Sequence, residues 1–480
     1  MTIITTPAQT PILNLSRLMP IQAGAALIAF AVMLFAPQVL SDPDTYWHLA
    51  AGEWMIAHGR VLHHDVFSFS HAGQPWQTHE WLSEVIMGLA FRAGGWSGLL
   101  ILYAASVAAA AALLASRLSR WLSGLALVVV LALASACIAP SLLLRPHVLV
   151  LPIVVAWTAE LLCARDEGRG PHWFMAGLMV LWANLHGSYV FGFLLFAPFA
   201  LEALVAATAG RLQVFRAWAP VGILCAAAAL ATPHGLAGVI HPFQLMGMKT
   251  LNAIVEWRPA DFAEMTGFEI ALLATLFFCL SRGVRIAPLR LVLLLFMLHM
   301  SLQHQRHQIV LAIAAPLILA QPLAETLGQT AHARMRSSTN WAVFVVMAML
   351  LAGVRIAFPA TRSDGPITPG LALAHVPADL AARPVLNSYG FGGYLIFLGV
   401  RPFIDGRADM YGDDHMRLHQ RLMNGDPASF DEAAQRYGLA WALLSPGEPL
   451  VSAMSAKPGW RRLYGDRNAV VFVRDSKPRP

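Results

Sequence analysis

Two carboxylates stand directly after the first long apolar stretch of the chain. Asp42 and Asp44 flank Pro43 and open a polar segment, residues 41–84, in an otherwise hydrophobic first half. A pair of carboxylates can act as a general base, or can bind a divalent cation such as Mg²⁺ or Mn²⁺ through oxygen ligands. An Asp-Pro-Asp sequence also favours a helix start, here expected for residues 45–58, so a purely structural role as a helix cap stays open.

The segment that follows Asp44 concentrates histidine and tryptophan. Its histidines lack the i, i+4 spacing of a zinc-binding HExxH helix, so the sequence predicts no zinc site here and favours hydrogen-bonded or exposed loop positions for most of them. The tryptophans fit an interfacial belt, and they fit equally well a stacking surface for a sugar. These residues are His48, His58, His63, His64, His71 and His79, with Trp47, Trp54, Trp76 and Trp81.

Five shorter polar clusters lie at the ends of later apolar stretches. Arg145 and Arg306 are the residues in them that could hold an anion, because a guanidinium matches two phosphate oxygens at once. Snorkelling of the side chain toward the membrane interface is the alternative explanation. The clusters are residues 144–147, 184–187, 232–235, 256–259 and 303–307. With the first segment they supply the candidate substrate-binding residues Glu80, His79, Trp81, Arg145, His147, His186, His234, Glu256, His304 and Arg306.

The composition places these motifs in a membrane protein. Of the 480 residues, 57% are hydrophobic and 12% are charged, whereas about a quarter of a soluble protein is charged. The net charge of +6 lies largely in short loops, where it indicates membrane topology and not a nucleic-acid partner. The four cysteines lie in or beside apolar stretches without CxxC spacing, which favours small core residues. We expect a polytopic α-helical membrane protein that binds no nucleic acid.

The apolar stretches predict about eleven transmembrane helices, since about 20 apolar residues cross a hydrocarbon core of about 30 Å. The first stretch, residues 21–40, is expected to be an uncleaved signal anchor. Residues 84–92 are expected to form an amphipathic helix along the membrane surface. The other stretches are residues 97–116, 121–139, 148–164, 173–189, 190–208, 217–232, 268–281, 289–303, 307–324 and 340–357.

Arginine is unevenly distributed between the loops, and by the positive-inside rule the arginine-rich loops are cytoplasmic. The N-terminus is then cytoplasmic, whereas the first loop and the C-terminal part are periplasmic, in a bacterial inner membrane. All the polar clusters fall on the outer side. Because ionisable groups at membrane depth tend to line a cavity or a substrate path, we expect one external polar pocket. The arginines assigned to the cytoplasmic side are Arg17, Arg117, Arg120, Arg165, Arg169, Arg211, Arg216, Arg282, Arg285, Arg290, Arg334 and Arg336.

Residues 360–480 differ in character from residues 1–359. We expect a transmembrane domain, residues 1–359, with a large first external loop at residues 41–96, and then a periplasmic α/β domain. Short apolar runs predict strands at residues 384–386, 394–397, 440–444 and 469–473, with helices at residues 416–423 and 429–437. Asp405, Arg407 and Asp409 are interpreted as a buried ion network, with contact to an acceptor as the alternative.

The first loop carries an extended motif, G-x-V-x-x-x-D-x-F-S-F-S-x-x-G-x-P-W-x-x-x-E-W-L, from Gly59 to Leu82. It resembles the first external loop of the glycosyltransferase C superfamily, which includes aminoarabinose transferases and protein mannosyltransferases. The resemblance implies transfer of a sugar from a polyprenyl-phosphate carrier on the outer face of the membrane, usually with inversion. The chain departs from the aminoarabinose transferases in having Asp-Pro-Asp for their Asp-Glu, and Glu80 where they tend to have lysine or proline.

The resemblance also implies roles for individual residues. The catalytic base maps onto Asp44, with Asp42 as the second choice, and the basic residues beside the lipid phosphate map onto Arg145 and Arg306. The acceptor would be a glycan, a lipid or a protein of the cell envelope. Two other functions stay open. One is a transporter or flippase-like protein for a polar lipid or polysaccharide, although the two halves of the chain show no similarity that would favour it. The other is a non-enzymatic subunit of an envelope polysaccharide assembly.

Overall fold

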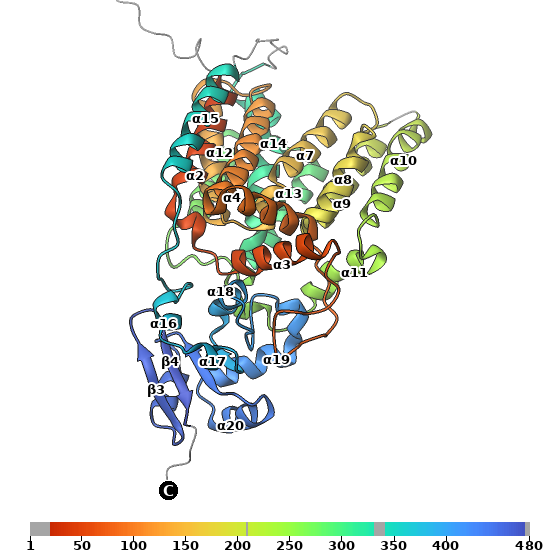
Figure 1. Ribbon diagram of the computed structural model, residues 1–480. Coiled ribbons are helices and arrows are strands. Elements are labelled where there is room, and N and C mark those ends of the chain that lie inside the picture. The colour runs from red at the N-terminus through yellow and green to blue at the C-terminus, as the bar shows by residue number, and fades with distance from the viewer. Residues whose placement is uncertain (1–19, 208–209, 331–340, 476–480) are drawn as a thin grey trace, which may run out of the picture.

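The computed structural model describes residues 20–207, 210–330 and 341–475. Helices fill the part of the chain before residue 360, and a smaller part with a β-sheet packs against one end of them (Figure 1). Three of the arginines used for the topology, Arg17, Arg334 and Arg336, lie outside the described residues. The orientation in the membrane and the domain division at residue 360 stay predictions.

Each apolar stretch found in the sequence forms a helix over most of its length. A helix satisfies its backbone hydrogen bonds within the segment, which a lipid environment requires. The helices are α2 (Ile21–Phe35), α4 (Trp81–Leu118), α5 (Gly124–Ile138), α7 (Leu151–Asp166), α8 (Phe174–Leu185), α9 (Val190–Ala206), α10 (Arg211–Ala229), α12 (Gly267–Arg282), α13 (Pro288–Gln303), α14 (Gln308–Thr326) and α15 (Trp341–Ala357).

Five helical segments in the described residues are long and apolar enough to cross a membrane, judged by length and composition. They are Trp81–Leu118, Gly124–Ser141, Gly187–Ala206, Arg211–Ala229 and Gln305–Thr326. The predicted class, a polytopic helical membrane protein with a small C-terminal sheet, is confirmed, whereas the number of about eleven spans stays a prediction.

Residues 84–92 are helical, as expected, and belong to the first part of α4, which a break at Gly94 and Gly95, where Gly95 has a φ of 57°, separates from the part that runs to Leu118. One face of this first part packs against α3 (Asp44–His58), so Glu84 is 1% exposed, whereas Leu89 is 52% exposed. Its position along a membrane surface stays a prediction. A Cβ at Gly52 of α3 would overlap the carbonyl oxygen of Glu84, so the two helices cross at close range.

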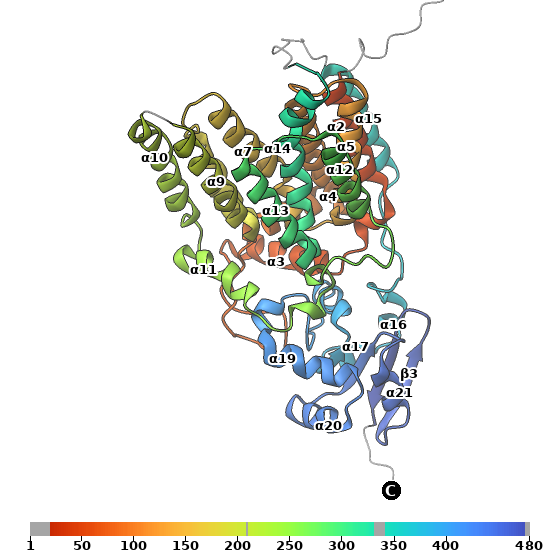
Figure 2. The same ribbon diagram turned by 180° about the vertical axis from the view of Figure 1, so that it is seen from behind.

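Helix α3 lies across the end of the helical part that faces the sheet-containing part (Figures 1 and 2). Several short elements carry the polar clusters: α6 (Pro146–Leu149), η3 (Gly187–Tyr189), α11 (Gly235–Met246), η5 (Val255–Trp257) and η6 (Gln305–His307). Side chains of these clusters meet, since Glu256 contacts both Arg145 and Arg306, and His186 contacts Glu80 of the first loop.

The C-terminal part contains a four-stranded sheet in the order β1-β2-β4-β3. Strand β1 (Val385–Asn387) runs parallel to β2 (Trp441–Leu444), with Leu386 opposite Ala442, and β4 (Val470–Arg474) is antiparallel to both β2 and β3 (Trp460–Gly465). The helices around it are α16 (Gly370–Ala374), α17 (Ala378–Ala381), α18 (Gly392–Phe397), α19 (Ala408–Met423), α20 (Pro427–Arg436) and α21 (Pro449–Ser455).

Two details of the predicted sheet were wrong. Residues 394–397 form the end of helix α18 and not a strand, because an apolar run this short has no periodicity that separates helix from strand. Strand β3 was missed because it is a largely exposed edge strand without an apolar run. The helices predicted at residues 416–423 and 429–437 are present in α19 and α20.

A buried guanidinium links the first loop to the C-terminal part. Arg407 is 1% exposed and contacts Asp65 Oδ1 of the first loop at 2.7 Å and both carboxylate oxygens of Asp405 at 2.8 and 2.7 Å. The Tyr411 hydroxyl donates to Asp405 Oδ2 at 2.6 Å, and the guanidinium lies 4.6 Å from the Trp76 ring. Asp405 and Arg407 thus form the expected buried network, whereas Asp409 lies apart from it.

We predict that Arg407→Met destabilises the protein strongly, because it leaves two carboxylates buried without a counter-charge, a change that costs about 3–5 kcal/mol. The measurement is the thermal midpoint of the purified protein in detergent. Arg417→Met is the matched control: Arg417 pairs with Asp414 from an exposed position on α19, so its loss should change stability by no more than about 0.5 kcal/mol. Equal midpoints for the two variants would contradict the prediction.

Candidate functional site

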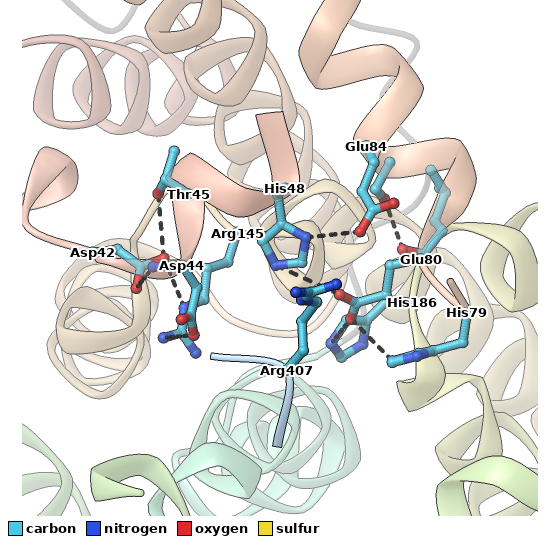
Figure 3. Close-up of polar contacts among 12 residues, drawn as sticks. Asp42, Asp44, Thr45, His48, His79, Glu80, Glu84, Arg145, His186 and Arg407 are labelled. Carbon is cyan, nitrogen blue, oxygen red and sulfur yellow. Dashed lines mark hydrogen bonds and ion pairs between the residues drawn. The ribbon is translucent and has the colours of Figure 1, made fainter. Parts of the chain in front are cut away.

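The start of α3 fixes the two aspartates found in the sequence. Asp42 is 1% exposed and accepts hydrogen bonds from the backbone N–H of Asp44 at 3.2 Å and from the hydroxyl of Thr45 at 3.3 Å. It therefore holds the turn that leads into the helix, but the N-cap residue is Pro43 and α3 has no side-chain cap hydrogen bond, so the interpretation of the motif as a helix cap is not confirmed. Asp44 is the first residue of the helix and has its carboxylate free for other partners (Figure 3).

Arg145 connects three carboxylates from distant parts of the chain. Its Nε lies 2.7 Å from Asp42 Oδ2, one terminal nitrogen lies 2.6 Å from Asp44 Oδ2, and the other contacts Glu256 Oε2. Arg306 lies 3.3 Å from Glu256 Oε1, and its guanidinium is 4.2 Å from the Trp257 ring. We call Asp42, Asp44, Arg145, Glu256 and Arg306 the carboxylate–arginine cluster.

The carboxyls of this cluster differ in proton affinity. Burial raises the pKa of Asp44 to about 7, and the nearby Asp42 and Glu256 add to the rise, although Arg145 opposes it. Burial would also raise the pKa of Glu256, but Arg145 and Arg306 outweigh it and lower that pKa to about 2. Asp44 is therefore the member that can exchange a proton near neutral pH, while Glu256 stays ionised.

The geometry does not fit the Mg²⁺ or Mn²⁺ ion that the sequence suggested for Asp42 and Asp44. Both carboxylates already face the guanidinium of Arg145 at hydrogen-bonding distance. A hard cation needs such oxygens for itself, together with several further oxygen ligands. The positive charge at this position is thus supplied by the protein.

A second group of side chains surrounds Glu80, the residue before α4 (Figure 3). Glu80 Oε1 lies 3.1 Å from His186 Nε2 and 3.6 Å from His79 Nε2, and Glu80 Oε2 lies 3.7 Å from His48 Nε2. His48 Nδ1 is 3.1 Å from Glu84 Oε1. We call these five residues the Glu80 cluster.

Burial favours the neutral forms of the groups in the Glu80 cluster, although their distances resemble those of ion pairs. Burial raises the pKa of Glu80 to about 8, with Arg306 and Arg145 opposing the rise. Burial also lowers the pKa values of His48 and His186 far below the ordinary range. A protonated Glu80 among neutral imidazoles is a hydrogen-bond donor, and this avoids the cost of burying several unbalanced charges.

The remaining predicted residues lie around these two clusters. Trp81 donates its indole N–H to Asn184 Oδ1 at 2.7 Å, which anchors the start of α4 to the end of α8. Two histidines hold backbone carbonyl oxygens: His147 Nε2 is 2.8 Å from that of Ser141, and His304 Nδ1 is 2.7 Å from that of Trp257. His234 lies apart from the carboxylate–arginine cluster, with its ring 5.0 Å from the ring of His63.

Sequence reasoning missed three residues beside the clusters. His48 falls in the helix expected at residues 45–58 but was given no role in a site, whereas α3 buries it against Glu80 and Glu84. His241 of α11 and Asp409 of α19 approach His79: the rings of His79 and His241 are 4.5 Å apart, and His241 Nε2 is 3.6 Å from Asp409 Oδ2. No spacing in the sequence connects these residues, because they come from separate elements.

The C-terminal part closes directly over Asp44. A Cβ at Gly406 would overlap Asp44 Oδ1, and a Cβ at Gly393 would overlap the carbonyl oxygen of Pro43. The segment that follows α18 and the start of α18 itself therefore touch the beginning of α3 with no room for a side chain. The candidate site is complete only with the C-terminal part in place.

Comparisons with known proteins identify the fold. No protein-family model matches the chain, and no curated protein matches it by sequence. Among solved structures, ArnT from Cupriavidus metallidurans bound to undecaprenyl phosphate is 13% identical, with a TM-score of 0.53 over 95% of this chain and 98% of that one. AglB from Archaeoglobus fulgidus, an oligosaccharyltransferase in complex with an inhibitory peptide and a dolichol-phosphate, is 10% identical, with a TM-score of 0.54 over 96% and 74%.

These likenesses, at such low identity, concern the fold. The chain has the membrane fold of the glycosyltransferase C enzymes, as the motif in its first loop predicted.

We predict that Gly406→Ala displaces Asp44 or the segment over it, because the added methyl group has no space, and that it destabilises the protein by about 1–3 kcal/mol as other overpacked sites do. Gly390→Ala is the matched control, because a Cβ at Gly390 meets nothing within 4 Å. Thermal midpoints of both variants in detergent provide the measurement. A Gly406→Ala variant as stable as Gly390→Ala would mean that the contact with Asp44 is looser than described.

Proposed function

We propose that this chain is a glycosyltransferase of the bacterial inner membrane. It transfers a sugar from a polyprenyl-phosphate-linked donor to a glycan, lipid or protein acceptor of the envelope, on the outer face of the membrane and with inversion. The observation that carries the proposal is a half-buried carboxyl, Asp44, whose pKa is raised to about 7, placed 2.6 Å from an arginine in a cluster that holds a second arginine. Carriers of the same class, undecaprenyl phosphate and dolichol-phosphate, are bound in two solved structures with this fold.

In the proposed reaction, Asp44 is the general base. Its carboxylate takes the proton of an acceptor hydroxyl while the acceptor oxygen forms a bond to the anomeric carbon of the sugar. The bond from that carbon to the phosphate oxygen breaks on the opposite face, and the lipid phosphate leaves with the bonding electrons. A base whose pKa lies near the working pH is best suited to such a step.

The two arginines are assigned different roles. Arg145 is surrounded by Asp42, Asp44 and Glu256, so its main role is to position Asp44 and to keep the three carboxylates together. Arg306 has Glu256 as its single ion-pair partner among the described residues. It therefore has more capacity to bind the charge that develops on the departing phosphate.

The Glu80 cluster is assigned to substrate binding. A protonated Glu80 can donate a hydrogen bond to a sugar hydroxyl or a phosphate oxygen, and the neutral imidazoles of His79 and His186 can accept or donate according to their tautomers. Preorganised groups of this kind orient the donor without contributing net charge.

The central prediction concerns Asp44→Asn, which keeps the size of the side chain and removes the base. We expect at least about a 100-fold loss of transfer, measured as radiolabel passing from a panel of polyprenyl-phosphate sugars into envelope acceptors. Asp261→Asn is the control, because Asp261 is exposed and only caps a local turn. If Asp44→Asn keeps nearly the turnover of the parent protein, Asp44 is not the base. If the parent protein transfers no label from any donor but moves labelled lipid across the membrane of vesicles, the result supports the transporter alternative.

The pH dependence of transfer provides an independent check. Because the pKa of Asp44 is raised, its active carboxylate form is lost as the pH falls through about 7. We therefore expect kcat/KM to rise about tenfold per pH unit between pH 5 and 6.5 and to level off above about 7.5. Glu256, with a pKa of about 2, would give no such rise. A rate independent of pH over this range would contradict the role of Asp44.

A further inference from the structure

Two arginines at the far end of the helical part line a cavity. Arg117 lies in the last turn of α4 and Arg120 just after it, and together with α7, α13 and α14 they enclose a volume of about 60 Å³. Because α4 begins beside α3 and runs away from it, the cavity lies at the end of the helical part opposite the candidate site (Figure 1). The topology predicted from the sequence puts this end on the cytoplasmic side.

Both guanidinium groups approach the same weak acceptor. Arg120 Nη1 lies 3.1 Å and Arg117 Nη1 lies 3.5 Å from the Sγ of Cys163 on α7. A thiol sulfur accepts hydrogen bonds only weakly, and a neutral thiol does not balance two cations. Neither arginine has a carboxylate partner among the residues that the structure describes. Two half-buried like charges beside one atom repel each other, so an anion between them would be stabilising.

The acidic residues of the cavity are paired with other arginines. Asp166 Oδ1 lies 2.7 Å from a terminal nitrogen of Arg290, and Arg290 Nε lies 3.0 Å from Glu202 Oε2. Glu167 Oε2 lies 2.7 Å from Arg169 Nε. These carboxylates therefore do not supply the counter-charge that the two arginines at the end of α4 require.

The size and the lining of the cavity fit a phosphate group that carries an apolar substituent. The volume of about 60 Å³ is several times the roughly 10–15 Å³ that one water molecule requires. Guanidinium groups match pairs of phosphate oxygens. Beside the arginines the lining is apolar, with Trp121, Leu162, Leu317 and Ile318. A free phosphate ion gains nothing from these side chains, whereas the hydrocarbon part of a phospholipid does.

We propose that Arg117 and Arg120 bind the phosphate of an anionic phospholipid from the cytoplasmic leaflet. Basic pockets between transmembrane helices on this side of a membrane suit such headgroups, and the negative surface of the leaflet raises their local concentration. The bound headgroup supplies the missing counter-charge and connects the end of α4 to α7 and α14. The site lies at the opposite end of the helical part from Asp44, so the proposal does not depend on sugar transfer.

Snorkelling toward water is the alternative explanation for arginines at the end of a membrane helix. It accounts less well for these two side chains, because both turn toward Cys163 on a neighbouring helix and line a cavity. An arginine that only snorkels has no reason to share an acceptor with a second arginine.

The test measures bound lipid and not activity. The full-length protein is purified in detergent, freed of lipid and titrated separately with phosphatidylglycerol, zwitterionic phosphatidylcholine and inorganic phosphate. Native mass spectrometry reports bound lipid, and a thermal scan gives the midpoint. We expect phosphatidylglycerol to bind and to raise the midpoint, because a ligand of the folded state stabilises it, and the other two to do so much less. Arg117→Gln and Arg120→Gln should each weaken the binding of phosphatidylglycerol about fivefold, the effect of one arginine near an anionic surface.

Arg285→Gln is the matched control, because Arg285 is exposed in the loop between α12 and α13 at the same end of the helical part. This variant loses an equal charge outside the cavity and should bind phosphatidylglycerol like the parent protein. A second measurement locates the lipid: a headgroup in the cavity covers Cys163, so phosphatidylglycerol should slow the alkylation of Cys163 by iodoacetamide in the parent protein.

Three results would overturn the proposal. The parent protein binds phosphatidylglycerol no better than phosphatidylcholine, or Arg285→Gln loses as much affinity as Arg120→Gln, or inorganic phosphate raises the midpoint as much as phosphatidylglycerol does, in which case the ligand is a free anion. The lipid-free midpoints show whether each variant is folded. If neither cavity variant folds, the protection of Cys163 in the parent protein decides.

Discussion

The ion pairs of Arg145 are the interaction on which the candidate site depends. Three carboxylates close to one another would repel and would each lose hydration, so their presence at a buried or half-buried position requires a cation between them. Arg145 meets this requirement with a separate nitrogen for each of Asp42, Asp44 and Glu256. The balance is incomplete, because burial still raises the pKa of Asp44 to about 7. That remaining imbalance makes one carboxyl of the cluster a base suited to neutral pH.

The same physical solution recurs where the C-terminal part joins the first loop. Arg407 lies between Asp65 and Asp405, fully enclosed, and the residue before it, Gly406, lies against Asp44. The sheet-containing part is therefore joined to the site through a buried charge network and through backbone contact.

The helical architecture and the position of the site could largely be predicted from the sequence. Apolar stretches of sufficient length have to become helices in lipid, because each backbone group must be satisfied within the segment. The rarity of ionisable residues in such stretches made Asp42, Asp44, Arg145, Glu256 and Arg306 conspicuous, and these five do meet. The motif from Gly59 to Leu82 predicted the fold that the solved structures share.

The sequence by itself thus determined the class of protein, the helices and the residues of the carboxylate–arginine cluster. Only the tertiary structure decided which histidines are buried, that burial raises the pKa of Glu80 to about 8, and that His79, His241 and Asp409 meet. It also decided that residues 394–397 are helical, since a run this short takes its conformation from its neighbours. The physical reason is common to all of these: burial, proton affinity and contact depend on groups brought together from distant parts of the chain, and no local pattern records them.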